Sequence, residues 1–165
     1  MESVDVIITV INVILAVASS IGAYNSIKYF KKSHNLTIYA QTNNALVEIQ
    51  KMLIKLPEAL VASNVSNRNK KGFSLENTIC SIGHELMNSL TEIRSSIPQE
   101  YSDEFKELEN EASFQLQRYL NSYISGEAIT ESGISSLEYN LCQTRLVDMQ
   151  DFLKKKTSEI AEKLK

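Results

Sequence analysis

The chain has 165 residues, of which 43% are hydrophobic and 22% charged, and its formal net charge at pH 7 is −3. Five Gly, two Pro and no Trp, without an internal repeat, a low-complexity tract or an alternating strand-like run, argue against a sheet protein and favour helices. The charge is uneven. Lys and Arg outnumber Asp and Glu by eight to four in residues 1–71 and are outnumbered by nine to sixteen in residues 72–165.

The run from Val6 to Ile27 contains no charged residue. As a helix rising 1.5 Å per residue it would extend about 33 Å, enough to cross the hydrocarbon core of a bilayer. Residues 1–32 are therefore predicted to form a single transmembrane helix with a basic juxtamembrane flank. Acidic Glu2 and Asp5 precede the run and three lysines follow it, which predicts an outside N-terminus and a cytoplasmic C-terminal domain at the inner (plasma) membrane. The acidic N-terminus also argues against a cleaved signal peptide.

Small and polar residues in this run fall on one side of the predicted helix. They recur at alternating steps of four and three, a spacing that keeps side chains on one helical face. Such residues let membrane helices approach closely, and an Asn in mid-span requires a hydrogen-bonding partner. The stripe therefore predicts self-association of the span, with lining of a water-filled pore or an incidental pattern as the alternatives. The predicted self-association residues are Thr9, Asn12, Ala16, Ser19 and Ala23, and Asp5 and Ser26 extend the stripe at its two ends.

Beyond the span, the sequence predicts an all-α cytosolic domain, an antiparallel bundle of about four helices. A helical stalk and first bundle helix occupy residues 33–62, with Pro57 as a stop or kink. Whether the helix runs unbroken through residues 33–35 is left open. The three-helix remainder occupies residues 74–165, with helices over about 75–97, 101–125 and 134–164. The boundary signals are an N-cap at Ser74, a closing Pro98, a stop at Gly126 and a capping box formed by Ser135 and Glu138.

Residues 63–73 form a polar loop rich in Asn, and this loop is the candidate ligand site. Its cations and amide donors together suit an anionic, phosphate-bearing ligand, and a symmetric oligomer would repeat the cluster around an axis. A solvated loop, or one that contacts anionic headgroups, is the alternative. The candidate ligand-binding residues are Arg68, Lys70, Lys71, Asn67 and Asn69, with Asn64 beside them.

Little else in the sequence indicates chemistry. Cys80 and His84 are four residues apart, but two ligands do not make a zinc site, and Cys80 is expected to be a small core residue. Cys80 and Cys142 are expected to be free thiols. The acidic residues between Glu100 and Glu111 are expected to be a solvated face near a helix N-terminus. No phosphate loop or nucleophile elbow is present, so no enzyme activity, metal or cofactor is expected.

An N-terminal span at residues 4–27 followed by a small cytosolic helical domain resembles the membrane effectors of bacterial antiviral defence. The resemblance covers the architecture of the chain and implies that a cyclic oligonucleotide or a partner protein switches a membrane protein, which then disturbs the bilayer. The stripe and the polar loop themselves predict a homo-oligomer in contact with membrane lipid that senses an anionic small molecule such as a nucleotide, and no duplex nucleic acid is expected. The alternative is a membrane-tethered adaptor or scaffold without pore or ligand-gated activity.

Overall fold

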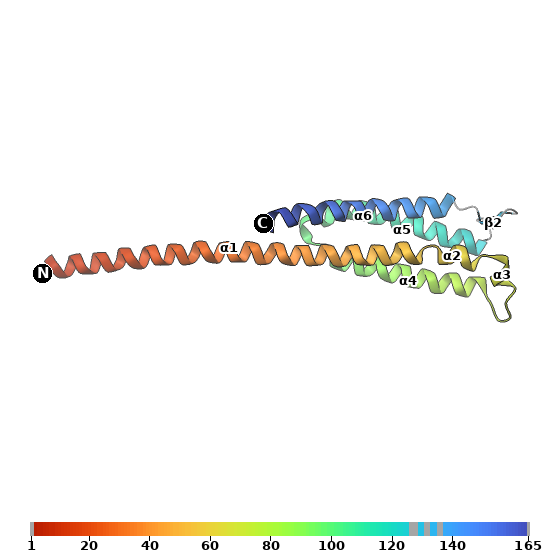
Figure 1. The fold of residues 1–165 in the computed structure, drawn as a ribbon, viewed down its shortest axis with the longest axis horizontal. Helices are drawn as coiled ribbons and strands as arrows, with labels where there is room; N and C mark the ends of the chain where they lie inside the picture. The colour runs from red at the N-terminus through yellow and green to blue at the C-terminus, as the bar shows by residue number, and fades with distance from the viewer. Residues whose placement is uncertain (1, 126–128, 131–132, 135–136, 165) are drawn as a thin grey trace.

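The computed structural model describes residues 2–125, 129–130, 133–134 and 137–164, and it describes side chains from Asn12 to Ser125 and from Leu137 to Leu164. Helices account for nearly all of these residues (Figure 1). The elements in chain order are α1 (Glu2–Lys55), α2 (Glu58–Ala62), α3 (Val65–Arg68), α4 (Leu75–Ser96), the 3₁₀ helix η1 (Gln99–Tyr101), α5 (Ser102–Ser125), β1 (Ile129–Thr130), β2 (Gly133–Ile134) and α6 (Leu137–Leu164).

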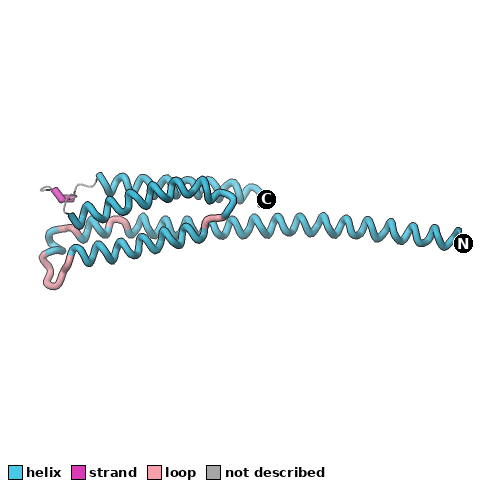
Figure 2. The backbone as a smooth tube through the Cα atoms, turned by 180° about the vertical axis from the view of Figure 1, so that it is seen from behind, coloured by secondary structure: helices cyan, strands magenta, loops and turns pink. Residues whose placement is uncertain are grey.

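The second half of α1 packs with α4, α5 and α6 in an up-and-down bundle (Figures 1 and 2). Each long helix runs antiparallel to the one before it, and α6 returns beside α1. The helix α1 therefore has α4 and α6 as neighbours, and α5 closes the ring between them. The prediction of an all-α helical bundle is confirmed.

The helices join through one hydrophobic core. On α1 the buried positions follow alternating steps of four and three from Ile38 through Ala45, Ile49 and Met52 to Leu56, the spacing of a helix that buries one side. Thr42 fills the remaining place in this series, and its hydroxyl hydrogen-bonds both the Ile38 carbonyl and the buried Tyr101 hydroxyl. The other helices supply the rest of the core, including Ile79, Leu86, Ile93, Phe105, Leu116, Tyr119, Tyr123, Leu146, Met149 and Leu153.

The first half of α1 projects from the bundle as a single rod (Figure 1). The helix is continuous through residues 33–35, so the stalk and the apolar run belong to one element. Every described side chain from Asn12 to His34 is exposed. Across the part of the chain that the structure describes, no helix combines the length and the apolar composition that a membrane span requires. The side chains of residues 6–11, where the predicted span begins, lie outside the described ones.

Two boundaries differ from the sequence prediction. The last helix begins at Leu137 instead of about residue 134, because Ile134 belongs to β2 and pairs with Ile129 of β1 in a short antiparallel ladder. Within the predicted polar loop, one turn of helix forms as α3. The predicted stop at Gly126 and the predicted capping residue Ser135 lie outside the described residues.

Candidate functional site

The predicted ligand loop is organised by its own asparagine side chains. Asn64 is the N-cap of α3, and its side-chain oxygen accepts a hydrogen bond from the Ser66 amide at 2.9 Å, as N-cap residues do. The Asn67 side chain donates to the Val61 carbonyl at 2.6 Å and accepts from Lys70 Nζ at 2.9 Å. These amides therefore hold the loop in shape before any ligand is present.

Arg68 is also committed to the loop. Its Nε donates to the Ser63 carbonyl at 2.8 Å, and its buried Nη2 has no hydrogen-bond partner among the described atoms. Asn69 is the C-cap of α3, and Gly72 takes a positive φ of 79°, which glycine adopts at little cost. Of the predicted binding residues, Asn69, Lys70 and Lys71 are the ones exposed to solvent.

The loop and the apolar part of α1 lie at opposite ends of the bundle (Figure 2). Between Lys32 and Lys55 the helix α1 advances about 35 Å, at 1.5 Å per residue, and α2 and α3 follow beyond that point. A bilayer that surrounds the apolar run would therefore be far from Lys70 and Lys71. This separation disfavours the alternative in which the loop contacts lipid headgroups of that bilayer.

The predicted self-association stripe lies on the projecting part of α1. Asn12, Ala16, Ser19 and Ala23 are all exposed on a helix that contacts no other element there. Thr9 lies outside the described side chains. Large apolar and aromatic side chains are exposed on the same segment, namely Val13, Ile14, Leu15, Val17, Ile21, Tyr24, Ile27, Tyr29 and Phe30.

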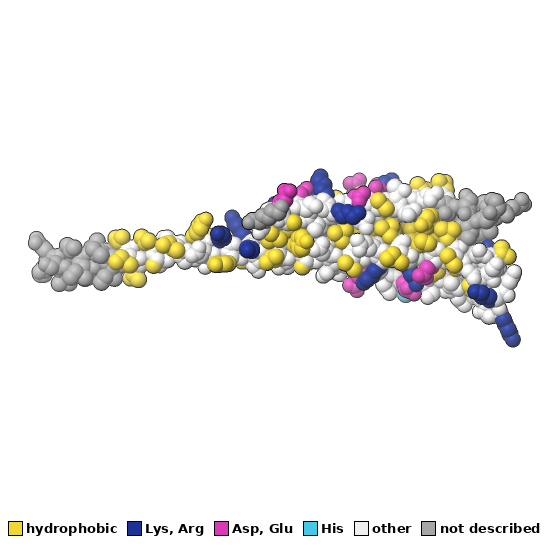
Figure 3. Space-filling model, viewed as in Figure 1, with side chains coloured by type: hydrophobic (Ala, Val, Ile, Leu, Met, Phe, Trp, Pro, Cys, Tyr) yellow, Lys and Arg dark blue, Asp and Glu magenta, His cyan; other side chains and the backbone are white. Residues whose placement is uncertain are grey.

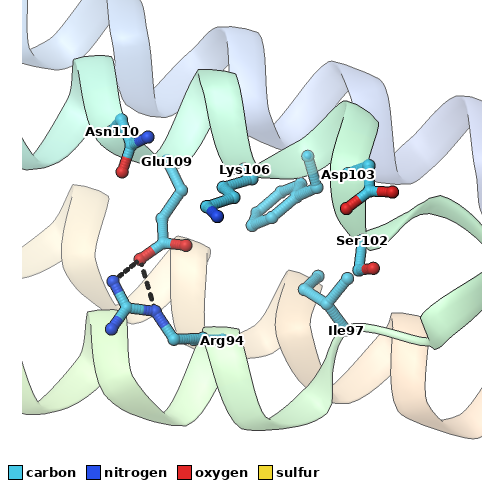
Figure 4. Close-up of a pocket in the computed structure, with 8 residues that line it drawn as sticks. Arg94, Ile97, Ser102, Asp103, Lys106, Glu109 and Asn110 are labelled. Carbon is cyan, nitrogen blue, oxygen red and sulfur yellow. Dashed lines mark hydrogen bonds and ion pairs between the residues drawn. The ribbon is translucent and has the colours of Figure 1, made fainter.

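A cavity of about 480 Å³ lies between the end of α4 and the start of α5 (Figure 4). Glu109 reaches from α5 toward α4 and forms an ion pair with Arg94, whose Nε lies 2.9 Å from Oε1 of the carboxylate. The Glu109 side chain is 6% exposed, whereas that of Arg94 is 68% exposed. The remaining lining residues are Ile97, Ser102, Asp103, Phe105, Lys106 and Asn110. The cavity thus combines an apolar floor with both signs of charge.

The sequence interpretation missed this site because it assigned the acidic residues to a solvated face. Glu109 instead occupies a core position, four residues after Phe105 and three before Ala112. That spacing was the available signal, because a carboxylate in the apolar series of a helix requires a partner. Glu100, Glu104 and Glu111 also have cross-helix partners, which are His34, Lys156 and Arg145.

The two cysteines occupy different surroundings. Both are free thiols, but Cys80 is exposed, so the prediction that it is a core residue is wrong. It lies one position beyond buried Ile79, on the solvent side of α4. Cys142 is fully buried, and burial raises the pKa of its thiol to about 12. Within the described residues no three His, Cys, Asp or Glu side chains are grouped to hold a metal ion.

Comparison with protein-family models, with curated proteins and with solved structures finds no match for this chain. The class is therefore defined by architecture alone. The chain is an up-and-down helical bundle in which one core helix continues outward as a rod with exposed apolar side chains.

Proposed function

We propose that this is a self-associating membrane protein whose helical bundle senses an anionic ligand or a partner in the cytoplasm and acts on the membrane through α1. The observation that supports it best is the continuity of α1. One unbroken helix contributes core residues such as Ile49 and Met52 to the bundle. The same helix carries the exposed apolar side chains of residues 13–30, which we call the apolar segment. A displacement of α1 within the bundle would reach that segment through rigid helical backbone.

The exposed side chains of the rod support a membrane location. Ile14, Val17 and Ile21 are each more than half exposed, and soluble monomers rarely expose contiguous apolar surface of more than a few hundred Å². The proposed span, Val6 to Ile27, is followed by Lys28, Lys31 and Lys32, and basic residues mark the cytoplasmic side of a span. Aromatic residues at positions 24, 29 and 30 stand where interfacial aromatics are expected.

Two places on the bundle could receive the signal. Lys70 and Lys71 present cations to solvent at the end away from the proposed membrane. The cavity beside Arg94 and Glu109 offers charged groups over an apolar floor. An anionic small molecule such as a nucleotide fits the first place, as the resemblance to antiviral effectors implies, and a partner protein is the other input that it implies.

The test uses the predicted stripe in the full-length chain. Asn12→Leu should leave membrane insertion intact and weaken self-association in detergent cross-linking, because it removes an interhelical hydrogen bond of about 0.6 kcal/mol, and up to about 2, from each subunit. Ala16→Leu should act in the same direction through steric bulk. Both variants should also abolish membrane depolarisation on induced expression.

Ile14→Leu is the matched control, because it lies off the stripe and keeps the apolar character of the helix. If Asn12→Leu and Ala16→Leu behave like Ile14→Leu, the stripe is incidental and the tethered adaptor becomes the better interpretation. If the chain stays in the soluble fraction, the membrane proposal itself is wrong.

A further inference from the structure

One side of α1 remains uncovered even where the helix is part of the bundle. From Ile38 to Met52, each buried residue of α1 is followed two positions later by an exposed residue. We call these exposed positions the outer face of α1. Val47 is 48% exposed and Ile54 is 79% exposed, high values for apolar side chains on a folded bundle. The outer face consists of Ala40, Asn44, Val47, Lys51 and Ile54.

The outer face has almost no charge. Residues 35–47 contain no Asp, Glu, Lys or Arg, and the one charged residue of the face, Lys51, pairs with Glu48 of its own helix. In Figure 3 hydrophobic side chains gather along the middle of the bundle, between the lines of α1 and α6, and most charged side chains lie toward its upper and lower edges. A solvated helix face normally carries charged residues, so this one has the composition of a contact surface.

The same seven-residue register continues into the apolar segment. Steps of seven back from Ala40 reach Ser33, Ser26, Ser19 and Asn12, and steps of seven back from Asn44 reach Thr37, Phe30, Ala23 and Ala16. The predicted stripe and the outer face are therefore one series on one unbroken helix. A strict seven-residue repeat stays on one side when helices supercoil around each other with a left-handed twist.

We infer that a second copy of this chain covers the outer face, so that two α1 helices lie parallel from the apolar segment down to Ile54. The inference rests on the proposed function, which places both copies in one membrane with the same orientation and depth. Equal depth brings each position of α1 beside its own counterpart, so Val47 meets Val47 and Ile54 meets Ile54. A strongly acidic or basic partner would find no complementary charge on this face.

This arrangement has a consequence for the cavity between α4 and α5. The helices beside α1 are α4 and α6, and α5 lies across the bundle from α1. A pair that meets through α1 therefore leaves the cavity at Arg94 and Glu109 on the outside, open to solvent. Two copies can therefore pair through α1 while a ligand or partner occupies the cavity of each copy.

Single-cysteine cross-linking of the full-length chain in membranes tests the inference. The background is Cys80→Ser, which removes the exposed native thiol, while buried Cys142 stays. Val47→Cys and Ile54→Cys should form dimers with a short bis-maleimide several-fold faster than Thr91→Cys, an exposed position on α4. Equal rates at all three positions would overturn the inference. With Ala40→Cys, another exposed position of the outer face, as the cross-linking site, Val47→Glu combined with Ile54→Glu should lower the dimer yield, and an unchanged yield counts against the inference.

Ser19→Cys separates this inference from the proposed function. Dimers at Ser19→Cys without dimers at Val47→Cys or Ile54→Cys mean that the apolar segment associates and the outer face does not, so only the inference fails. Dimers at Val47→Cys and Ile54→Cys without dimers at Ser19→Cys keep the outer face and reject the predicted stripe. If none of these positions gives dimers, self-association is rejected both in the proposed function and in this inference.

Discussion

At the residue scale, Glu109 shows how a charged side chain can occupy a core position. Its carboxylate is largely removed from water but lies against Arg94, whose guanidinium remains mostly in solvent. The hydrogen bond that Arg94 donates to this carboxylate raises the pKa of its guanidinium. Because the cation keeps much of its hydration, the desolvation cost of the pair falls mainly on the carboxylate. The pair therefore lines the cavity with a buried carboxylate that keeps a charged partner.

Tyr119 shows how a neutral polar group is satisfied inside the same core. Its ring is fully buried, and its hydroxyl donates a hydrogen bond to the Leu56 carbonyl, next to Pro57. Proline has no amide hydrogen, so the helical ladder is interrupted at this place. Burial raises the pKa of the Tyr119 hydroxyl, which keeps it a neutral donor. One side chain from α5 thus binds the backbone directly after the end of α1.

The cysteines give a prediction at this scale. A thiol-specific reagent at pH 8 should label Cys80 within minutes and leave Cys142 unlabelled in the native protein, because the thiolate is the reactive form and Cys142 is buried, with a pKa of about 12. Mass spectrometry of the labelled chain distinguishes the two sites. In denaturant both should react. Rapid native labelling of Cys142 in Cys80→Ser protein would show that the core opens at α6.

At the scale of the elements, the contact between α4 and α5 depends on Gly83. A Cβ atom at this position would lie 3.1 Å from Leu120 Cδ1, closer than nine in ten real Cβ contacts, so the Leu120 side chain would have to shift by a few tenths of an ångström. The missing side chain lets the two helices approach where Leu86 and Leu116 complete the core. Glycine costs about 1 kcal/mol in a helix interior relative to Ala, so its presence in α4 reflects packing.

Gly83→Leu is therefore expected to lower the free energy of unfolding by about 1–3 kcal/mol, the usual range for an overpacked core. Denaturant unfolding followed by circular dichroism measures the change. Gly22→Leu is the matched control, since a Cβ there meets nothing within 4 Å. A loss of stability at Gly22 equal to that at Gly83 would contradict the packing explanation.

At the scale of the whole molecule, the second half of α1 is one of the helices of the bundle, and its first half is the rod, or arm, that projects from it. Residues near the point of exit tie the two parts together. His34 Nε2 lies 2.9 Å from Glu100 Oε1, and Thr42 hydrogen-bonds Tyr101 beside η1. The C-terminal end of α6 lies at this same end of the bundle (Figure 1). The exit of the arm is therefore surrounded by the turn between α4 and α5 and by the end of α6.

The continuity of α1 can be measured as a distance. Spin labels at Ala23→Cys and Val47→Cys, in Cys80→Ser protein mixed with an excess of unlabelled chain so that only distances within one chain are seen, should give a narrow distribution centred at about 36 Å, from 24 residues at 1.5 Å each. Ser33→Pro should broaden and shorten that distribution, because proline breaks the helical ladder, and should leave the melting temperature of the bundle nearly unchanged. Ser33→Ala is the control. A broad distribution in the protein without proline would mean that the arm and the bundle move independently.

The sequence by itself determined the helical class, most helix boundaries and the apolar segment. These features depend on local spacing: Ser74 caps α4, the stop at Pro57 follows from its missing amide, and the steps from Ile38 to Leu56 mark a buried side. Each is encoded within a turn or two of the residues concerned, so no knowledge of neighbouring helices is needed.

Only the tertiary structure decided which side chains remain free to act. Arg68 and Asn67 resembled ligand donors in the sequence, but they hydrogen-bond carbonyls of residues 63 and 61, which the turn of α3 brings within reach. Glu109 and Arg94 became a pair because antiparallel α4 and α5 bring residues fifteen apart together. The exposure of Cys80 likewise depends on which side of α4 faces the other helices. Hydrogen bonding and burial depend on which groups meet in space, and local periodicity does not specify those partners.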